Sequence, residues 1–145
     1  MRIDALREAI VARLAVLTMD ATLKAAAAAF SKRHVGLVIV CDGNGAVAGV
    51  ISKSDLVRHL ASEGAADASV ATRMSRDVIC CRPEDDLHET WKIMAARSLQ
   101  NIPVLNAGSE PVGILDIRDA LKALFEQEEY EEHLMSNYIA GVGYQ

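Results

Sequence analysis

The sequence has few aromatic residues and no long apolar run. Only 4% of its 145 residues are Phe, Trp or Tyr, although 51% are hydrophobic, so a buried core has to be built from Val, Ile, Leu and Ala. No apolar run reaches the roughly 18 to 20 residues of a membrane-spanning helix, which argues against a membrane partner. The first residues, Met1–Glu8, lack the basic and then apolar order of a signal peptide.

Cysteine and positive charge are also scarce. The three cysteines include the adjacent Cys80 and Cys81 but no C-x-x-C pair, so the sequence supports neither a disulfide framework nor a zinc site. We therefore expect no metal and a cytoplasmic location. The net charge of −5 argues against a nucleic-acid partner, which requires a basic face.

What the chain does contain is an internal repeat. The segment Gly49–Asp55 (GVISKSD) is followed 64 positions later by Gly113–Asp119 (GILDIRD). The same offset relates further positions without a gap: Leu23 with Leu87, Val38 with Ile102, Val40 with Val104, and Leu60 with Leu124. A constant internal period indicates one supersecondary unit that is present twice.

Each copy has the pattern of a β-α-β-β-α unit, which places the chain in the α/β (α+β) class. In the first copy we expect strand 15–18, helix 23–33, strand 37–41, strand 46–51 and helix 52–60. In the second copy we expect strand 78–81, helix 86–97, strand 102–105, strand 111–115 and a helix from residue 116 towards 139. Asp-Gly and Asn-Gly in 42–45 predict a hairpin turn.

These elements define the expected domain organisation. It consists of an N-terminal helix in 1–14, a first repeat in 15–62, a linker in 63–74, a second repeat in 75–125, and a C-terminal helix and tail in 126–145. The run Ala25–Ala29 presents a helix face with little side-chain bulk, and the terminal helix extends beyond the repeat. We expect these two surfaces to pack against a second copy of the chain, which gives a homodimer.

The repeated motif has two local interpretations. In Ser52-x-x-Asp55 the hydroxyl and the carboxylate match a capping box at the start of a helix, which needs no ligand. The capping interpretation explains less well why an oxygen-bearing side chain and an acid follow a Gly-apolar-apolar segment in both copies. A ligand site therefore remains open beside the cap.

The order, duplication and spacing of these segments resemble a pair of CBS domains, an arrangement called a Bateman module. The resemblance is carried by His34–Val40, Gly49–Asp55, Gln100–Leu105 and Gly113–Asp119, and it covers most of the chain. More narrowly, the chain resembles the stand-alone bacterial two-CBS proteins that end in an extra helix. It implies two repeats that pack sheet to sheet about a pseudo-two-fold axis, with a cleft on each side.

The resemblance also implies a ligand. Clefts of this family bind adenosine-containing molecules, namely AMP, ADP, ATP, NAD(H) or S-adenosylmethionine, without an obligatory cofactor. The motif Asp accepts hydrogen bonds from the ribose hydroxyls, and the Ser or Thr before it supports the nucleotide. On this chain, the implied ligand-binding residues are Ser52, Lys53, Asp55, Asp116, Arg118 and Asp119, with base contacts from Val16, Val35, Gly36, Leu37, Ile79, Asn101, Ile102 and Pro103.

The sequence departs from the family pattern in the second motif. Asp116 stands where many relatives have Ser or Thr, and a second carboxylate beside Asp119 disfavours phosphate unless Arg118 offsets it. Gln100 and Asn101 replace a basic pair, which removes further positive charge. We therefore expect weak rather than tight nucleotide binding.

Two functions follow from this pattern. The first is a non-catalytic sensor of adenine nucleotides that regulates a client protein of unknown identity. The alternative is a dimerisation or protein-interaction module in which ligand binding is weak or lost. No nucleophile–base pair or metal-ligand cluster is apparent, so we do not expect an enzyme.

Overall fold

The computed structural model describes residues 1–143 and the side chains of residues 1–140. The N-terminal segment forms η1 (Ile3–Leu6) and α1 (Arg7–Ala12). The first repeat contains β1 (Val16–Thr18), α2 (Leu23–Phe30), β2 (Val38–Cys41), β3 (Val47–Ile51) and α3 (Lys53–Ala61). η2 (Val70–Thr72) lies in the connection between the repeats, and the second repeat contains α4 (Leu87–Ala96), β4 (Asn101–Leu105), β5 (Pro111–Asp116) and α5 (Ile117–Gly143).

The two hairpins are built in the same register. In the first, Val38 pairs with Ile51 and a bulge follows Val40; in the second, Ile102 pairs with Leu115 and a bulge follows Val104. All of these positions differ by 64 residues, so the sequence offset is also the structural offset. The expected α/β fold with two repeats is confirmed.

The prediction of a strand at 78–81 is wrong, because no strand forms there. β1 adds a parallel third strand to the first sheet, where the Ile39 N–H donates to the Ala15 carbonyl at 2.9 Å. The residue equivalent to Ile39 is Pro103, which has no N–H to donate to Ile79. Only Cys81 forms an isolated bridge with β4 in the described chain, so the second sheet has two strands.

The expected helix 23–33 is shorter in the structure. The Thr22 side chain caps α2 by accepting a hydrogen bond from the Ala25 N–H at 3.1 Å. The helix ends at Phe30, and the Ser31 side chain then bonds back to the Ala28 carbonyl. Arg33 therefore lies beyond the helix, in the connection that leads to β2.

Each repeat is completed by the segment that precedes the other one. α1 precedes the first repeat but packs on β5, where a Cβ on Gly113 would come within 2.8 Å of the Ile10 carbonyl oxygen. Ser75 lies in the segment that leads into the second repeat but pairs with Val50 of β3. A Cβ on Gly49 would lie 2.7 Å from the Ser75 carbonyl oxygen, so both motif glycines permit a close backbone approach. As a result, the surfaces beside the motifs contain residues of both repeats.

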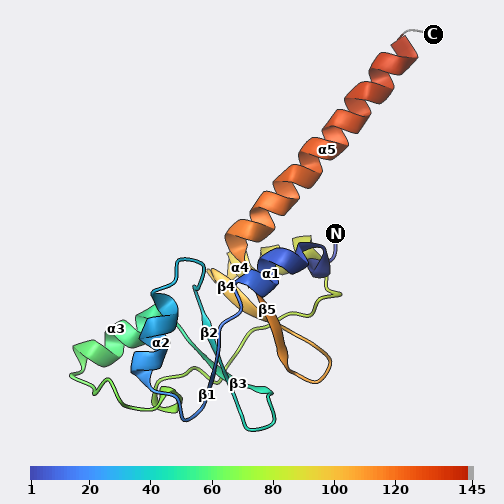
Figure 1. Cartoon of the computed structure of the whole chain (residues 1–145). Helices are drawn as coiled ribbons and strands as arrows, with labels where there is room; N and C mark the ends of the chain where they lie inside the picture. Colours follow the sequence, from blue (N-terminus) through green and yellow to red (C-terminus); the bar gives the residue numbers. More distant parts are fainter. Residues whose placement is uncertain (144–145) are drawn as a thin grey trace.

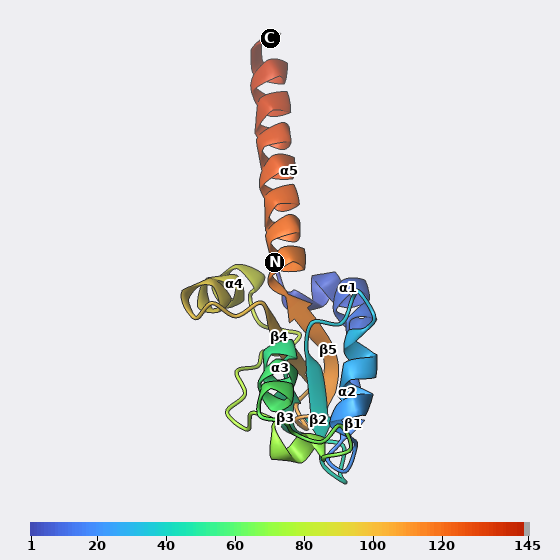
Figure 2. The same cartoon turned by 90° about the vertical axis from the view of Figure 1, so that its left-hand side faces the viewer.

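The two repeats share one interface in addition to their own cores. Each repeat has a buried apolar cluster, and a third cluster joins them. In that cluster Leu37, Ile39 and Cys41 of the first repeat pack with Ile114 of β5. The two sheets are therefore packed against each other through this cluster, and Figures 1 and 2 show their strands side by side.

The long helix α5 projects from the body beside α1 in both views (Figures 1 and 2). Its side chains from Glu128 to residue 140 are all exposed, including Tyr130, Leu134, Met135 and Tyr138. Residues 144 and 145 of the expected C-terminal segment lie outside the described residues. No helix in the described part of the chain is long and apolar enough to cross a membrane.

Candidate functional site

The first motif forms the start of α3, where Ser52 and Asp55 make a capping box. Ser52 Oγ accepts a hydrogen bond from the Asp55 N–H at 3.2 Å, and Asp55 Oδ2 accepts one from the Ser52 N–H at 2.8 Å. Asp55 Oδ1 accepts a hydrogen bond from Arg58 Nη2 at 2.8 Å, but the Arg58 side chain is 69% exposed. An exposed arginine is held weakly, so a ligand hydroxyl can replace it at Oδ1.

A cavity of about 260 Å³, which we call the Asp55 cleft, lies beside this cap. It contains side chains of both repeats because Ser75 and its neighbours pack on β3. Its lining includes two carboxylates and no Lys, Arg or His. The lining residues are Leu37, Val50, Ser52, Asp55, Ser75, Asp77, Val78, Ile79, Leu99, Asn101, Ile102 and Pro103.

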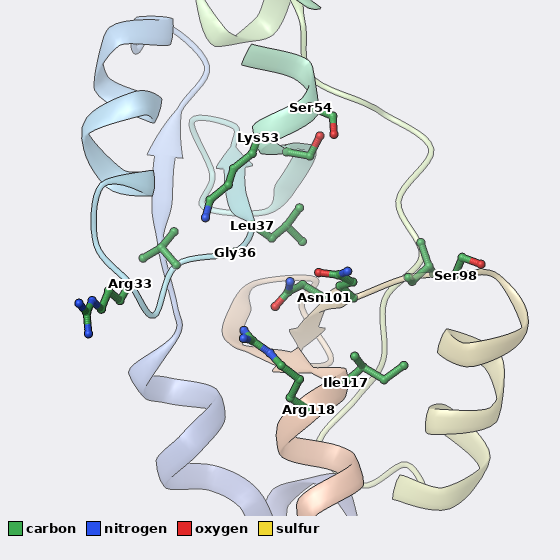
Figure 3. A pocket seen from close by; sticks show the side chains of 13 residues that line it. Arg33, Gly36, Leu37, Lys53, Ser54, Ser98, Asn101, Ile117 and Arg118 are labelled. Carbon is green, nitrogen blue, oxygen red and sulfur yellow. The ribbon is translucent and has the colours of Figure 1, made fainter. Parts of the chain in front are cut away.

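A larger cavity of about 790 Å³, which we call the cationic cavity, adjoins the Asp55 cleft. The two share Leu37, Ser52, Leu99 and Asn101. The cationic cavity is lined by Arg33, Lys53 and Arg118 and by no acidic residue. In Figure 3, Lys53 and Arg118 enter it from opposite sides, from the first turns of α3 and α5, and Arg33 lies at its edge.

The adjoining cavities therefore have opposite polarity. The Asp55 cleft offers hydrogen-bond acceptors and an apolar wall, which suit hydroxyl and amino groups on a flat apolar ring. The cationic cavity offers three positive side chains, and the N-terminus of α3 adds backbone N–H groups beside them. Such a surface suits an anion, phosphate above all. A ligand that spans both cavities has a neutral polyhydroxyl part and an anionic part.

The two carboxylates of the second motif, Asp116 and Asp119, are held in ion pairs with arginines. Arg13, which follows α1, donates from Nε to Asp119 Oδ2 and from Nη2 to Asp119 Oδ1 at 3.1 Å. Both oxygens of the carboxylate that the resemblance assigns to ribose are therefore occupied. Asp116 lies beside this pair, with its side chain 1% exposed and its Oδ2 3.5 Å from Arg13 Nη1.

Asp116 is a structural anion rather than a cavity-lining one. It accepts hydrogen bonds from the Arg118 N–H at 2.8 Å, from Nε at 3.0 Å and from Nη2 at 2.7 Å. Burial by itself raises the pKa of Asp116, but the hydrogen bonds from Arg118 and the charge of Arg13 outweigh burial and hold that pKa below its ordinary value. The hydrogen bond to Asp119 raises the pKa of Arg13. Both groups stay charged at neutral pH.

The structure divides the residues that the sequence proposed for ligand binding. Those that line the Asp55 cleft, the cationic cavity or both are Val35, Gly36, Leu37, Ser52, Lys53, Asp55, Ile79, Asn101, Ile102, Pro103 and Arg118. Val16 instead lines a separate hollow of about 350 Å³ between β1 and α2. Asp116 and Asp119 line neither cavity, because the two arginines cover them.

Sequence reasoning missed three charged residues at these sites. Arg33, in the connection after α2, lines the cationic cavity, and Asp77, just before the segment where a strand was expected, lines the Asp55 cleft. Arg13 occupies the carboxylate of Asp119. A signal for the last two was available: Arg13 and Asp77 are separated by the repeat offset of 64 and carry opposite charges.

The remaining residues offer no obvious metal site. Within the described residues, no group of three or more His, Cys, Asp or Glu side chains could hold a metal ion. Burial raises the pKa of the Cys81 thiol to about 12, so this cysteine is a neutral core residue at physiological pH. Cys41 is likewise buried.

Comparison with known proteins identifies the repeats. A family model described as "CBS domain" matches residues 6–62 and again residues 68–126. The curated relatives that the chain matches include one of which it spans 77% and others of which it spans about a third.

Solved structures share the fold. A CBS-domain protein from Agrobacterium tumefaciens is 26% identical, with a TM-score of 0.72 over 85% of this chain and 98% of that one. A CBS domain protein from Pyrobaculum aerophilum complexed with AMP is 24% identical, with a TM-score of 0.72 over 82% and 89%. The CBS domain pair of protein MJ0100, in complex with 5-methylthioadenosine and S-adenosyl-L-methionine, is 18% identical, with a TM-score of 0.73 over 88% and 98%.

Proposed function

The chain belongs to the CBS domain family, and we propose that it is a regulatory module that binds an adenine nucleotide in the Asp55 cleft and the adjoining cationic cavity. The observation that carries this proposal is the opposite polarity of the two cavities. Two proteins of the same fold are complexed with AMP or with S-adenosyl-L-methionine, which supports an adenosine-containing ligand.

In the proposed complex, the ribose hydroxyls donate to Asp55 Oδ1 and displace the exposed Arg58. The base lies against the apolar wall formed by Ile79, Ile102 and Pro103, and the phosphates extend towards Lys53 and the start of α3. AMP, ADP, ATP and NAD(H) fit this division of charge. S-adenosylmethionine lacks a phosphate and uses the Asp55 cleft alone.

The proposed role is binding rather than catalysis. Asp55 already caps α3, and Asp116 and Asp119 are fixed by arginines, so these carboxylates hold structure together. Ligand binding joins residues of both repeats across one cavity, which restrains their relative motion. A client protein that contacts both repeats responds to that change.

The test is isothermal titration of the full chain with AMP, ATP, NADH and S-adenosylmethionine. We expect Asp55→Asn to weaken AMP binding at least tenfold, because the amide replaces a charged acceptor at the ribose. An asparagine still accepts a backbone hydrogen bond, so α3 keeps its cap. The matched control is Asp119→Asn, which we expect to change AMP affinity by less than twofold.

Two results would overturn this proposal. If none of the four ligands binds at millimolar concentration, the chain is not an adenine-nucleotide module. If Asp119→Asn weakens binding as much as Asp55→Asn does, the ligand lies at the second motif and the Asp55 cleft is wrongly assigned. The melting temperature of each variant shows whether it is folded.

The second candidate function is a homodimeric interaction module. The exposed apolar side chains of α5, which include Phe125 at 59% and Tyr138 at 73%, favour it because such a helix buries little surface in a monomer. Light scattering at micromolar concentration tests the dimer: we expect twice the monomer mass of 15.6 kDa. The monomer mass would contradict it.

A further inference from the structure

Asn101 is the first residue of β4, and its side chain lies on the wall that the two cavities share. Its amide oxygen Oδ1 is buried and has no hydrogen-bond partner within residues 1–140. It is the one buried side-chain nitrogen or oxygen in that part of the chain without a partner. Unpaired buried acceptors destabilise a folded protein, so this one needs an explanation.

The fold does not require a polar side chain at this position. At the repeat offset, Asn101 corresponds to Leu37, which is buried in the interface between the sheets. The chain also makes room for the amide: a Cβ on Gly36 would lie 2.6 Å from Asn101 Nδ2. The side chain is therefore closely packed and yet has an unused acceptor beside a ligand cavity (Figure 3).

We propose that Asn101 recognises the base of the bound nucleotide and selects a 6-aminopurine over a 6-oxopurine. This inference rests on the proposed function, because it assigns the base to the wall of the Asp55 cleft. The terminal torsion of asparagine is soft, so Oδ1 turns towards the cavity when the base enters. Oδ1 then accepts from the 6-amino group, and Nδ2 donates to the ring nitrogen N7.

The Asn101 amide can pair fully with a 6-aminopurine, but with a 6-oxopurine it cannot do so in either of its two orientations. A 6-aminopurine presents one donor and one acceptor side by side on this edge, which match the acceptor and donor of asparagine. A 6-oxopurine presents two acceptors, O6 and N7. Whichever way the Asn101 amide is turned, its oxygen then faces an acceptor and stays unpaired. Sites that leave a buried polar group unpaired reject the wrong ligand strongly.

The experiment compares AMP with IMP, which differ in the group at position 6, by titration of the full chain. We expect AMP to bind the natural protein at least tenfold more tightly than IMP. We expect Asn101→Leu, which copies the residue of the first repeat, to bring the two affinities within twofold of each other by weakening AMP. Because both ligands are measured on the same variant, the ratio does not depend on the folded fraction.

The neighbouring Gln100→Leu is the matched control. Gln100 lines the cationic cavity but not the Asp55 cleft, so we expect its AMP-to-IMP ratio to equal that of the natural protein. The melting temperature of free Asn101→Leu should be unchanged or higher, because the variant loses an unpaired acceptor. A structural role would lower the melting temperature instead and leave the ratio as it was.

The outcomes separate this inference from the proposed function. If the natural protein binds AMP and IMP equally, or if Asn101→Leu keeps the natural ratio, Asn101 does not select the base and the nucleotide proposal stands. If the natural protein binds neither AMP nor any other adenine nucleotide, both proposals fail together.

Discussion

The two motif sites have the same backbone and opposite accessibility. Beside Asp55 the facing segment carries Asp77, and a cavity of about 260 Å³ is open. Beside Asp119 the equivalent position carries Arg13, which holds both carboxylate oxygens. Positions that correspond at the repeat offset thus carry opposite charges, and the one that carries Arg13 forms an ion pair with the motif carboxylate.

The largest expected effect comes from removing the residue that closes the second site. We expect Arg13→Met to lower the free energy of unfolding by about 2 kcal/mol at neutral pH, because it leaves Asp119 unpaired and Asp116 with one arginine fewer. Urea denaturation measures this change. Arg7→Met is the control for the loss of an arginine: Arg7 is the first residue of α1 and is exposed, and we expect a change below 0.5 kcal/mol.

The difference in stability between the natural protein and Arg13→Met should depend on pH. The pKa of folded Asp116 lies below its ordinary value of 3.8, so its ionised form contributes stability above that pH. This contribution is lost as the pH falls below 3.8 and through the lower pKa of the folded state. We therefore expect the difference between the natural protein and Arg13→Met to shrink in acid. A difference that stays constant down to pH 2 would show that the ion pairs do not stabilise this site.

A smaller effect tests the contrast between the acidic cleft and the cationic cavity. We expect Lys53→Met to weaken ATP binding about tenfold and to leave adenosine binding unchanged, because Lys53 lines the cationic cavity but not the Asp55 cleft. Titrations at one fixed ionic strength measure both affinities. In the free protein Lys53 Nζ lies 6.0 Å from the centre of the Phe30 ring, a contact that it exchanges for phosphate.

Lys32→Met is the control for net charge. Substitution of Lys32 removes the same charge, but Lys32 lines the separate hollow beside Val16. We expect its ATP affinity to stay within twofold of the natural value. Equal losses in the two lysine variants would mean that the overall charge of the protein, and not the cavity, attracts the phosphates.

The repeat made most of the fold predictable from the sequence. Because the offset of 64 has no gap, the hairpins and their helices followed from one pattern, and the apolar spacing from Leu121 to Tyr138 predicted that the last helix runs past the repeat. The capping box at Ser52 and Asp55 was also predictable, because it depends on residues three positions apart.

The composition of the cavities was harder to predict. Arg13 is 106 residues from Asp119 in sequence, and the contact exists only because α1 packs on the second repeat. Arg33 lines the cationic cavity from the connection after α2, which stops at Phe30, and sequence patterns define the ends of helices poorly. Local sequence patterns predict individual helices and strands. These two sites depend instead on how the segment that leads into each repeat packs against the other repeat.

The smallest expected effect concerns the missing third strand of the second sheet. We attribute its absence to Pro103, since the equivalent Ile39 donates the hydrogen bond that holds β1. In Pro103→Val the new N–H can donate to the Ile79 carbonyl, which contributes about 1 kcal/mol. Loss of the proline also increases the entropy of the unfolded chain, which offsets most of that gain. We therefore expect a net change in stability below 1 kcal/mol.

Amide hydrogen exchange is the sensitive measurement for this variant. If the proline alone keeps the sheet two-stranded, the amide of residue 103 in Pro103→Val should become protected to the same degree as that of Ile39. An amide at 103 that exchanges freely would mean that other contacts hold residues 78–80 away from β4. In that case the difference between the sheets arises from the segment that leads into the second repeat, and the Asp55 cleft owes its opening to that segment and not to the proline.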